Sequence, residues 1–174
     1  MLLFSFLFSL YAQPNPEPII ADRIVLVIQE KTITESEIAL ERDLATLIPS
    51  SSTLLQYYRP TSPQRALIQV TLLRLQAGEL NPYQARPAEI EKRFDVFRAQ
   101  WSEIAQYYAF LNQHGLTDER LLSYIKTLII AENYIEKNLG LANSMDLEEA
   151  RTRFEQWEES TIQNTRVRFV SKQD

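Results

Sequence analysis

The chain has 174 residues, of which 45% are hydrophobic and 24% charged, and its formal net charge is −5 at pH 7. This length suits one domain, since most domains hold about 100–150 residues. The acidic balance disfavours a nucleic-acid-binding protein, which needs a basic face for phosphate. The absence of cysteine excludes thiol catalysis, disulfides and cysteine-ligated zinc, and a single histidine disfavours His-rich metal sites. Composition therefore predicts no metal, no cofactor and no nucleic-acid partner.

The first twelve residues are predicted to be a secretory signal peptide. Residues 1–10 are almost wholly apolar and Ala12 is a small residue suited to cleavage. The run is about half of the ~20 residues that a spanning helix needs, so no transmembrane segment is expected. No Lys or Arg precedes Arg23, so the usual basic n-region is missing, and a buried N-terminal segment is the alternative. Residues 13–21, with alternate prolines, are predicted to be a linker. An exported chain without cysteine fits the periplasm of a Gram-negative bacterium.

The folded part, residues 22–174, is predicted to begin with a β-hairpin. Residues 24–28 are apolar and mostly β-branched, which predicts a strand buried on both faces. Thr32-Ile33 follows a polar turn as a short return strand. Residues 166–170 alternate charged and apolar side chains, a pattern typical of a half-exposed strand. Because these are the only strand candidates, the two ends of the chain are expected to pair in one sheet.

Between these strands, capping and terminating residues delimit five helices. The first is predicted over residues 35–47, opened by a capping box of Thr34 and Glu37. The later helices are bounded by Ser62-Pro63 and Gly78, by Pro87 and His114-Gly115, by Thr117 and Gly140, and by Asp146, which opens the last helix. The predicted fold is therefore mainly α: a five- to six-helix domain with a small sheet formed by the N-terminal hairpin and the C-terminal strand.

The third predicted helix carries a stripe of bulky side chains at alternating steps of four and three residues. The stripe consists of Ile90, Phe94, Phe97, Trp101, Ile104, Tyr108 and Leu111. A period of 3.5 residues places all of them on one face, with Ser102 as a candidate kink. We interpret the stripe as core rather than as a peptide groove, because seams of this period normally bury themselves.

The order of these segments resembles that of the SurA-like periplasmic chaperones. The resemblance is carried by the hairpin and capped helix at 22–38, the helix at 66–76, the stretch 114–132, and the terminal helix and strand at 154–157 and 166–170. Family members commonly insert parvulin-type prolyl isomerase domains before the C-terminal helix. Here Gly140 and Asp146 are too close for a domain of about 100 residues. The resemblance implies a single chaperone core, with an N-domain at 22–140 and a C-terminal helix and strand at 146–170.

The same resemblance implies a function without catalysis. The chain is expected to be an ATP-independent chaperone that binds unfolded outer-membrane or envelope proteins through extended segments rich in aromatic residues. The alternative is an assembly or structural subunit that holds one dedicated folded envelope partner. Because no isomerase domain fits, prolyl isomerase activity is predicted to be absent.

The candidate peptide-binding residues are the tyrosines that fall outside the stripe. Tyrosine suits an adaptable site because it combines apolar area with a hydroxyl that tolerates water. Loop tyrosines are also ordinary surface residues, which is the alternative interpretation. The predicted site consists of Tyr57, Tyr58, Tyr83 and Tyr107.

Three other features are interpreted structurally. His114 lies before a helix-ending glycine, where its ring suits the negative end of the helix dipole better than a ligand or catalytic role. Trp157 is interpreted as the anchor of the last helix rather than as an interaction hot spot. Arg166 and Arg168 share one face of the last strand, where they are expected to protect an exposed edge.

Overall fold

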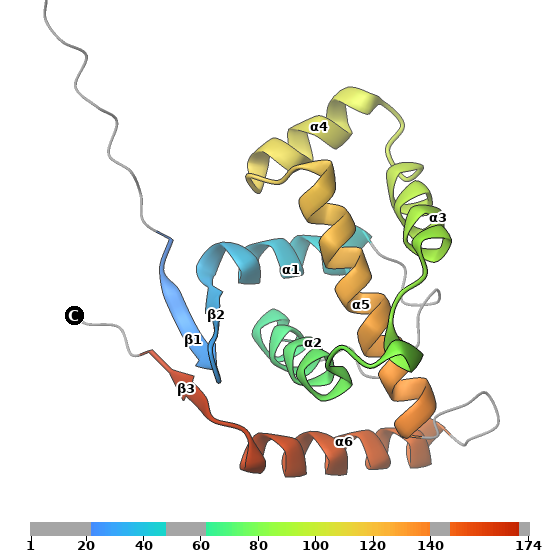
Figure 1. The fold of residues 1–174 in the computed structure, drawn as a ribbon. Helices are drawn as coiled ribbons and strands as arrows, with labels where there is room; N and C mark the ends of the chain where they lie inside the picture. Colours follow the sequence, from blue (N-terminus) through green and yellow to red (C-terminus); the bar gives the residue numbers. More distant parts are fainter. Residues whose placement is uncertain (1–21, 48–61, 140–146, 171–174) are drawn as a thin grey trace, which may run out of the picture.

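The computed structural model describes residues 22–47, 62–139 and 147–170. The chain is mainly helical with one small sheet, which confirms the predicted fold class (Figure 1). The expected signal peptide and linker, Tyr57, Tyr58, Gly140 and Asp146 lie outside the described residues. The described elements are β1 (Ile24–Ile28), β2 (Lys31–Thr34), α1 (Glu35–Leu47), α2 (Pro63–Ala77), the 3-10 helix η3 (Asn81–Tyr83), α3 (Pro87–Arg98), α4 (Ile104–Gln113), α5 (Asp118–Asn138), α6 (Leu147–Asn164) and β3 (Val167–Phe169).

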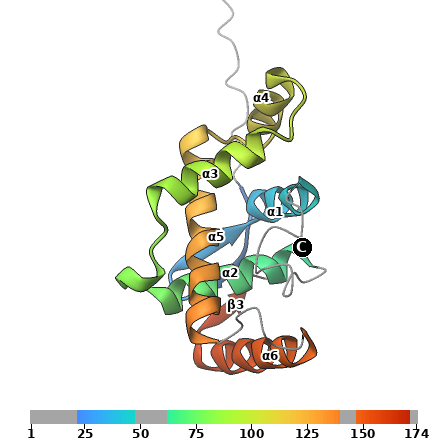
Figure 2. The ribbon, with the colours of Figure 1, turned by 90° about the vertical axis from the view of Figure 1, so that its right-hand side faces the viewer.

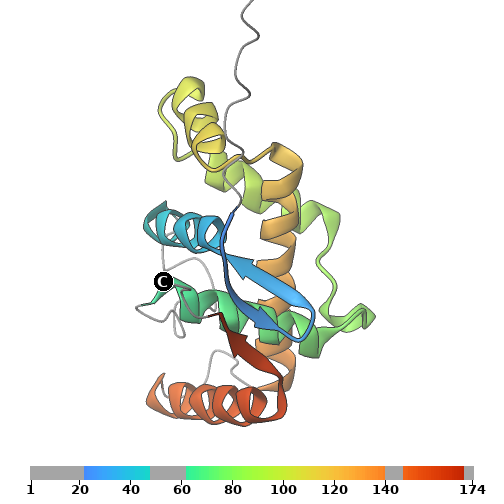
Figure 3. The ribbon, with the colours of Figure 1, turned by 90° about the vertical axis from the view of Figure 1, so that its left-hand side faces the viewer.

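The three strands form an antiparallel sheet in the order β2-β1-β3. A tight turn joins β1 to β2, and Gln29 takes a φ of 52° there. On the other side of β1, Leu26 is the register partner of Phe169. Figures 1 and 3 show β3 arriving beside β1 from the far end of the chain. The predicted pairing of the two chain ends is confirmed.

The sheet is buried on one face only. Leu26 and Ile28 have no solvent exposure, whereas Val25 and Val27 on the other face are half-buried and Ile24 is exposed. Figure 3 shows the helices behind one face of the sheet, with the second face toward the viewer. The prediction of a strand buried on both faces was therefore wrong. A continuous apolar run did not distinguish one covered face from two.

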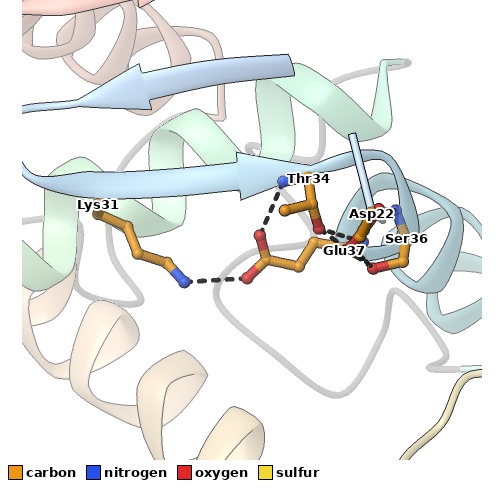
Figure 4. Close-up of polar contacts among 5 residues, drawn as sticks. All are labelled: Asp22, Lys31, Thr34, Ser36 and Glu37. Atoms are coloured by element: carbon orange, nitrogen blue, oxygen red, sulfur yellow. Dashed lines mark hydrogen bonds and ion pairs between the residues drawn. The ribbon is translucent and has the colours of Figure 1, made fainter. Parts of the chain in front are cut away.

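The start of α1 is fixed by the capping box that the sequence predicted (Figure 4). The backbone N–H of Thr34 donates to Oε2 of Glu37 at 3.0 Å, and the N–H of Glu37 donates to Oγ1 of Thr34 at 3.4 Å. Lys31 adds an ion pair to Oε1 of Glu37 at 2.9 Å. The Ser36 hydroxyl donates to Asp22 and, as the largest contribution, lowers the pKa of that carboxyl. These contacts join Asp22, β2 and α1 into one unit.

The start of α2 and the ends of α2 and α4 also lie where the sequence placed them. Ser62 caps α2 by accepting from the N–H of Arg65, with Pro63 in the first turn. Gly78 and Gly115 follow α2 and α4 with φ of 55° and 58°, a conformation that costs glycine little. Local capping chemistry therefore sets these boundaries.

Helix α5 is the centre of the helical layer. Figure 2 shows α3 and α4 toward one end of α5 and α6 toward the other. One core cluster joins α5 to α1, α3 and α4, and a second joins α5 to α2 and α6. A third lies between α2 and the sheet. Because α2 contributes to the second and third clusters, it connects the sheet to the helices.

Helix α6 is held on α2 and α5 by apolar packing and one ion pair. Phe154 is only 2% exposed, and Trp157 packs against both neighbouring clusters, with its ring centroid 5.3 Å from that of Phe154. Arg65 of α2 donates through Nε and Nη2 to the two carboxylate oxygens of Glu158, at 3.0 and 2.7 Å. The Glu158 side chain is almost wholly buried. Trp157 is thus an anchor of α6, as interpreted from the sequence.

Shortening Phe154 should loosen α6. Phe154→Ala is expected to lower the free energy of unfolding by about 3–5 kcal/mol, because it removes apolar contacts and leaves a cavity. Ile162→Ala is the matched control on the same helix, since Ile162 is already exposed, and it should cost about 1 kcal/mol or less. Urea denaturation measures both. Equal losses for the two variants would show that Phe154 does not anchor the helix.

A buried carboxylate connects α3 to α5. Oε2 of Glu132 accepts from Nη1 of Arg93 at 2.7 Å, whereas Oε1 is buried without a hydrogen-bond partner among the described residues. Burial raises the pKa of Glu132, and the guanidinium of Arg93 offsets this only in part. The folded chain therefore holds a proton on Glu132 more tightly than the unfolded chain does.

Glu132→Gln should remove one source of pH dependence in stability. Because the folded pKa is raised, the contribution of Glu132 is fully present below pH 4.5, the unfolded value, and is lost as the pH rises through the folded pKa. The unfolding free energy of the wild type minus that of Glu132→Gln should therefore fall as the pH rises above 4.5. Glu79→Gln is the control, because a hydrogen bond from Arg74 lowers the pKa of this exposed carboxyl. The unfolding free energy of the wild type minus that of Glu79→Gln should therefore rise slightly with pH. A rising difference for Glu132→Gln would contradict the assignment.

Candidate functional site

The candidate site lies where the expected third helix breaks in two. Helix α3 ends at Arg98 and α4 begins at Ile104. The residue preceding α4 is Glu103, which makes no side-chain cap, and Ser102 instead contacts Gln106 at 3.1 Å. The single helix expected from Pro87 to His114 was therefore wrong, although the break falls at the candidate kink.

The break changes which side chains α4 buries. Ile104 and Tyr108, which the stripe placed in the core, are 56% and 51% exposed. Tyr107, which the stripe left outside, is 1% exposed and packs with Phe110 and Leu111. The stripe correctly placed Phe94, Phe97 and Leu111 among the buried residues. A period of 3.5 residues cannot continue across a non-helical segment, so the prediction failed at Ile104 and Tyr108.

Aromatic rings fill the angle between the two helices. The Trp101 ring centroid lies 6.4 Å from Phe97, 5.3 Å from Phe110 and 6.5 Å from Tyr107. These separations are within the range of about 4.5–7 Å that favours tilted and edge-to-face pairs. These packed rings line the angle between α3 and α4.

An open pocket of about 310 Å³ lies beside these rings, at the lower end of the range of about 300–1,000 Å³ for ligand sites. Its rim carries both signs of charge, from Asp95 and Arg98, and the Arg98 guanidinium is 6.0 Å from the Phe94 ring centroid. The indole N–H of Trp101 is buried without an acceptor in the described part of the chain. We call this the elbow pocket; its lining residues are Asp95, Arg98, Ala99, Trp101, Ile104 and Tyr107.

Tyr107 is a fixed part of the pocket lining. Its hydroxyl donates to Oδ1 of Asp118, in the first turn of α5. Burial raises the pKa of Tyr107, and the adjacent Asp118 carboxylate raises it further, so the phenol stays neutral and remains a donor. Tyr107 therefore holds α4 on α5, and it presents little free surface to a peptide.

The other described member of the predicted tyrosine site lies elsewhere. Tyr83 is half-buried in η3 and donates its hydroxyl to Oδ1 of Asn138 at 3.0 Å, and its ring lies tilted against that of Tyr134 with the centroids 5.3 Å apart. Asp118 and Asn138 are the first and last residues of α5, and at 1.5 Å per residue these ends lie about 30 Å apart. The structure thus does not bring Tyr83 and Tyr107 together, and Tyr57 and Tyr58 lie outside the described residues.

A second groove, of about 480 Å³, runs between α2 and α6. It is lined by Arg65, Ile68, Glu155, Glu158, Glu159, Ile162 and Gln163. Arg65 is already engaged by Glu158, and none of the described residues that line the groove is aromatic. The elbow pocket, not this groove, therefore matches a function based on aromatic side chains.

The single histidine links two helices. Nε2 of His114 lies 3.0 Å from Oδ2 of Asp43 on α1, and the imidazole packs 4.9 Å from the Phe110 ring. Within residues 22–47, 62–139 and 147–170, no group of three or more His, Cys, Asp or Glu side chains is arranged to hold a metal ion. The surroundings of His114 are those of a structural contact between α1 and α4.

Comparison with known proteins gives no match: no family model fits the chain, and no curated protein or solved structure resembles it closely enough to be reported. Among the helices of the described part of the chain, none has the length and apolar character needed to cross a bilayer.

Of the residues that line the elbow pocket, only Tyr107 belonged to the predicted site, and the other five were missed. The stripe assigned Trp101 and Ile104 to the core, and Asp95, Arg98 and Ala99 were not considered. The signal that could have located the pocket is the non-helical segment itself, since a break beside aromatic residues exposes part of a face that a continuous helix would bury.

Replacing Tyr107 should weaken the joint between α4 and α5. Tyr107→Phe is expected to lower the free energy of unfolding by about 1.5–3 kcal/mol, because a hydrogen bond to a carboxylate is lost. Tyr108→Phe is the neighbouring control: Tyr108 is half exposed, so its change should stay within about 0.5 kcal/mol. Both are measured by urea denaturation, and an unchanged stability for Tyr107→Phe would contradict the role of its hydroxyl.

Proposed function

We propose that the chain is a non-enzymatic, ATP-independent chaperone that shields apolar segments of unfolded envelope proteins at the elbow pocket. The observation that carries the proposal is the exposure of Ile104 and Tyr108 beside an open pocket lined by Trp101 and Tyr107. Exposed apolar side chains beside a ring-lined pocket favour contact with another aromatic or aliphatic side chain.

The size of the pocket favours loose binding of an unfolded chain. Burying apolar area yields about 25 cal/mol per Å², so one side chain in the pocket contributes a few kcal/mol. Ordering the client opposes this gain. Affinity would therefore be micromolar and exchange fast, with several contacts along one client adding up. Such binding is useful to a holdase because it is readily reversed.

The order of elements supports the choice of client. The chain resembles the SurA-like chaperones in having a hairpin followed by a capped helix, then a helical layer, and then a terminal helix and strand that return to the hairpin. This resemblance implies unfolded outer-membrane proteins as clients and the periplasm as location. The expected signal peptide supports the same location. Catalysis is not part of the proposal, and the purified chain should leave the rate of proline cis/trans isomerisation unchanged.

Removing the exposed apolar pair should reduce the chaperone activity and leave the fold intact. The mature chain is expected to suppress light scattering by a denatured outer-membrane porin. Ile104→Ser with Tyr108→Ser should weaken client binding about tenfold, because about 1–2 kcal/mol of apolar contact is lost. Aggregation assays and a binding titration with the unfolded porin measure the two effects.

The control carries the same chemical change elsewhere. Leu75→Ser with Leu80→Ser removes two exposed leucines that are distant in sequence from the elbow pocket, and should leave protection intact. No protection by the wild type would reject the proposal. Equal loss in both double variants would reject the elbow pocket as the site. Capture of one stoichiometric folded partner from envelope extract, without unfolded clients, would favour the assembly subunit instead.

A further inference from the structure

The outer edge of β3 offers backbone groups that no described strand pairs with. In the order β2-β1-β3, one side of β3 faces β1 and the other faces no described strand. The N–H of Val170 donates to the carbonyl of Val25 at 2.8 Å, and the carbonyl of Arg166 accepts from the N–H of Gln29 at 2.9 Å. Since antiparallel pairs alternate between bonded and non-bonded residues, Val167 and Phe169 turn their N–H and C=O groups away from β1. We call these groups the β3 edge.

The side chains of β3 divide into two sets. Val167 packs against the cluster between α2 and the sheet, and Phe169 is the register partner of Leu26 yet is 62% exposed. Arg166 and Arg168 are exposed on the opposite face. Neither arginine makes an ion pair within the part of the chain that the structure describes. The edge thus presents two alternate positive charges on one face and an uncovered aromatic ring on the other.

We propose that the β3 edge binds an extended client segment as a fourth strand and selects segments in which acidic side chains alternate with apolar ones. The inference rests on the proposed function, because the added strand belongs to a client. Backbone hydrogen bonds to Val167 and Phe169 supply the pairing. Carboxylates at alternate positions lie beside Arg166 and Arg168, and the intervening apolar side chains cover Phe169.

Charge disfavours a second copy of this chain as the occupant in two symmetric registers. A symmetric antiparallel pairing centred on Arg168 places Arg168 opposite its equivalent. Centring the pairing on Val167 places Arg166 opposite Arg168. Like charges directly opposite each other destabilise a strand pair. The two arginines therefore disfavour self-association in these two registers, in the way that charges protect edge strands, and they leave the edge open to an acidic strand.

The test uses three short synthetic peptides and the full chain labelled with ¹⁵N. The first peptide alternates Glu with Val and Phe, the second has Lys in place of Glu, and the third is the first with its backbone N-methylated along one edge. The Glu peptide should slow hydrogen exchange at the amides of Val167 and Phe169. The Lys peptide should bind about tenfold more weakly, and the N-methylated peptide should give no protection at these amides.

Arg166→Glu with Arg168→Glu should reverse the preference, so that the Lys peptide binds better than the Glu peptide. Arg42→Glu with Lys92→Glu is the control. It changes the net charge by the same amount, but on α1 and α3, and should leave the peptide preference as in the wild type. Binding without protection of Val167 and Phe169, or a preference that ignores the reversal at Arg166 and Arg168, would overturn the inference.

Failure of the β3 edge as a binding site can be distinguished from failure of the proposed chaperone function. Ile104→Ser with Tyr108→Ser leaves β3 untouched, so this variant should bind the Glu peptide like the wild type. If porin protection fails while the Glu peptide still protects the two amides, the β3 edge stands as a binding site and the holdase proposal alone falls. If porin protection holds while the Glu peptide does not bind, the inference about the edge is overturned.

Discussion

The antiparallel pairing of β1 with β3 determines where both ends of the folded chain lie, and the arrangement of α6 depends on it. Two backbone hydrogen bonds, from Gln29 to Arg166 and from Val170 to Val25, mark the ends of this pairing. Once β3 is fixed beside β1, the preceding helix must cross α2, where Phe154, Trp157 and the Arg65–Glu158 ion pair hold it. A strand of only three residues thus closes a fold whose core is otherwise helical.

Helix α5 connects the part of the fold that β3 and α6 close to the part that holds α3 and α4. Its C-terminal half packs with α2 and α6, and its N-terminal half packs with α1, α3 and α4. The break between α3 and α4 is held on this rigid helix by the Tyr107–Asp118 hydrogen bond. The exposed side chains of the elbow pocket are therefore positioned by a well-packed support, while they themselves stay free of the core. A binding surface on a rigid scaffold loses less entropy when a client binds.

Local signals predicted the fold well, and signals that needed tertiary context failed. The Thr34–Glu37 capping box, the Ser62–Pro63 helix start and the terminal strand were readable because their chemistry lies within a few residues. The exposure of Ile104 and the burial of Tyr107 could not be predicted in this way, because they depend on where the helix breaks and on which helix α4 packs against. For the same reason the sequence could not show that the two described tyrosines of the predicted site, Tyr83 and Tyr107, contact opposite ends of α5. The apolar run of β1 likewise could not reveal that the helices cover only one of its faces.

Native-state hydrogen exchange at Gln29 and Val170 tests the central claim most directly. Both amides donate across the β1–β3 pair, so the account predicts that they exchange as slowly as amides of α2, which packs beneath the sheet. Phe154→Ala should accelerate both, since releasing α6 also releases β3. Exchange of Val170 at the rate of an unstructured peptide in the wild type would contradict the account, because the two chain ends would then not be joined.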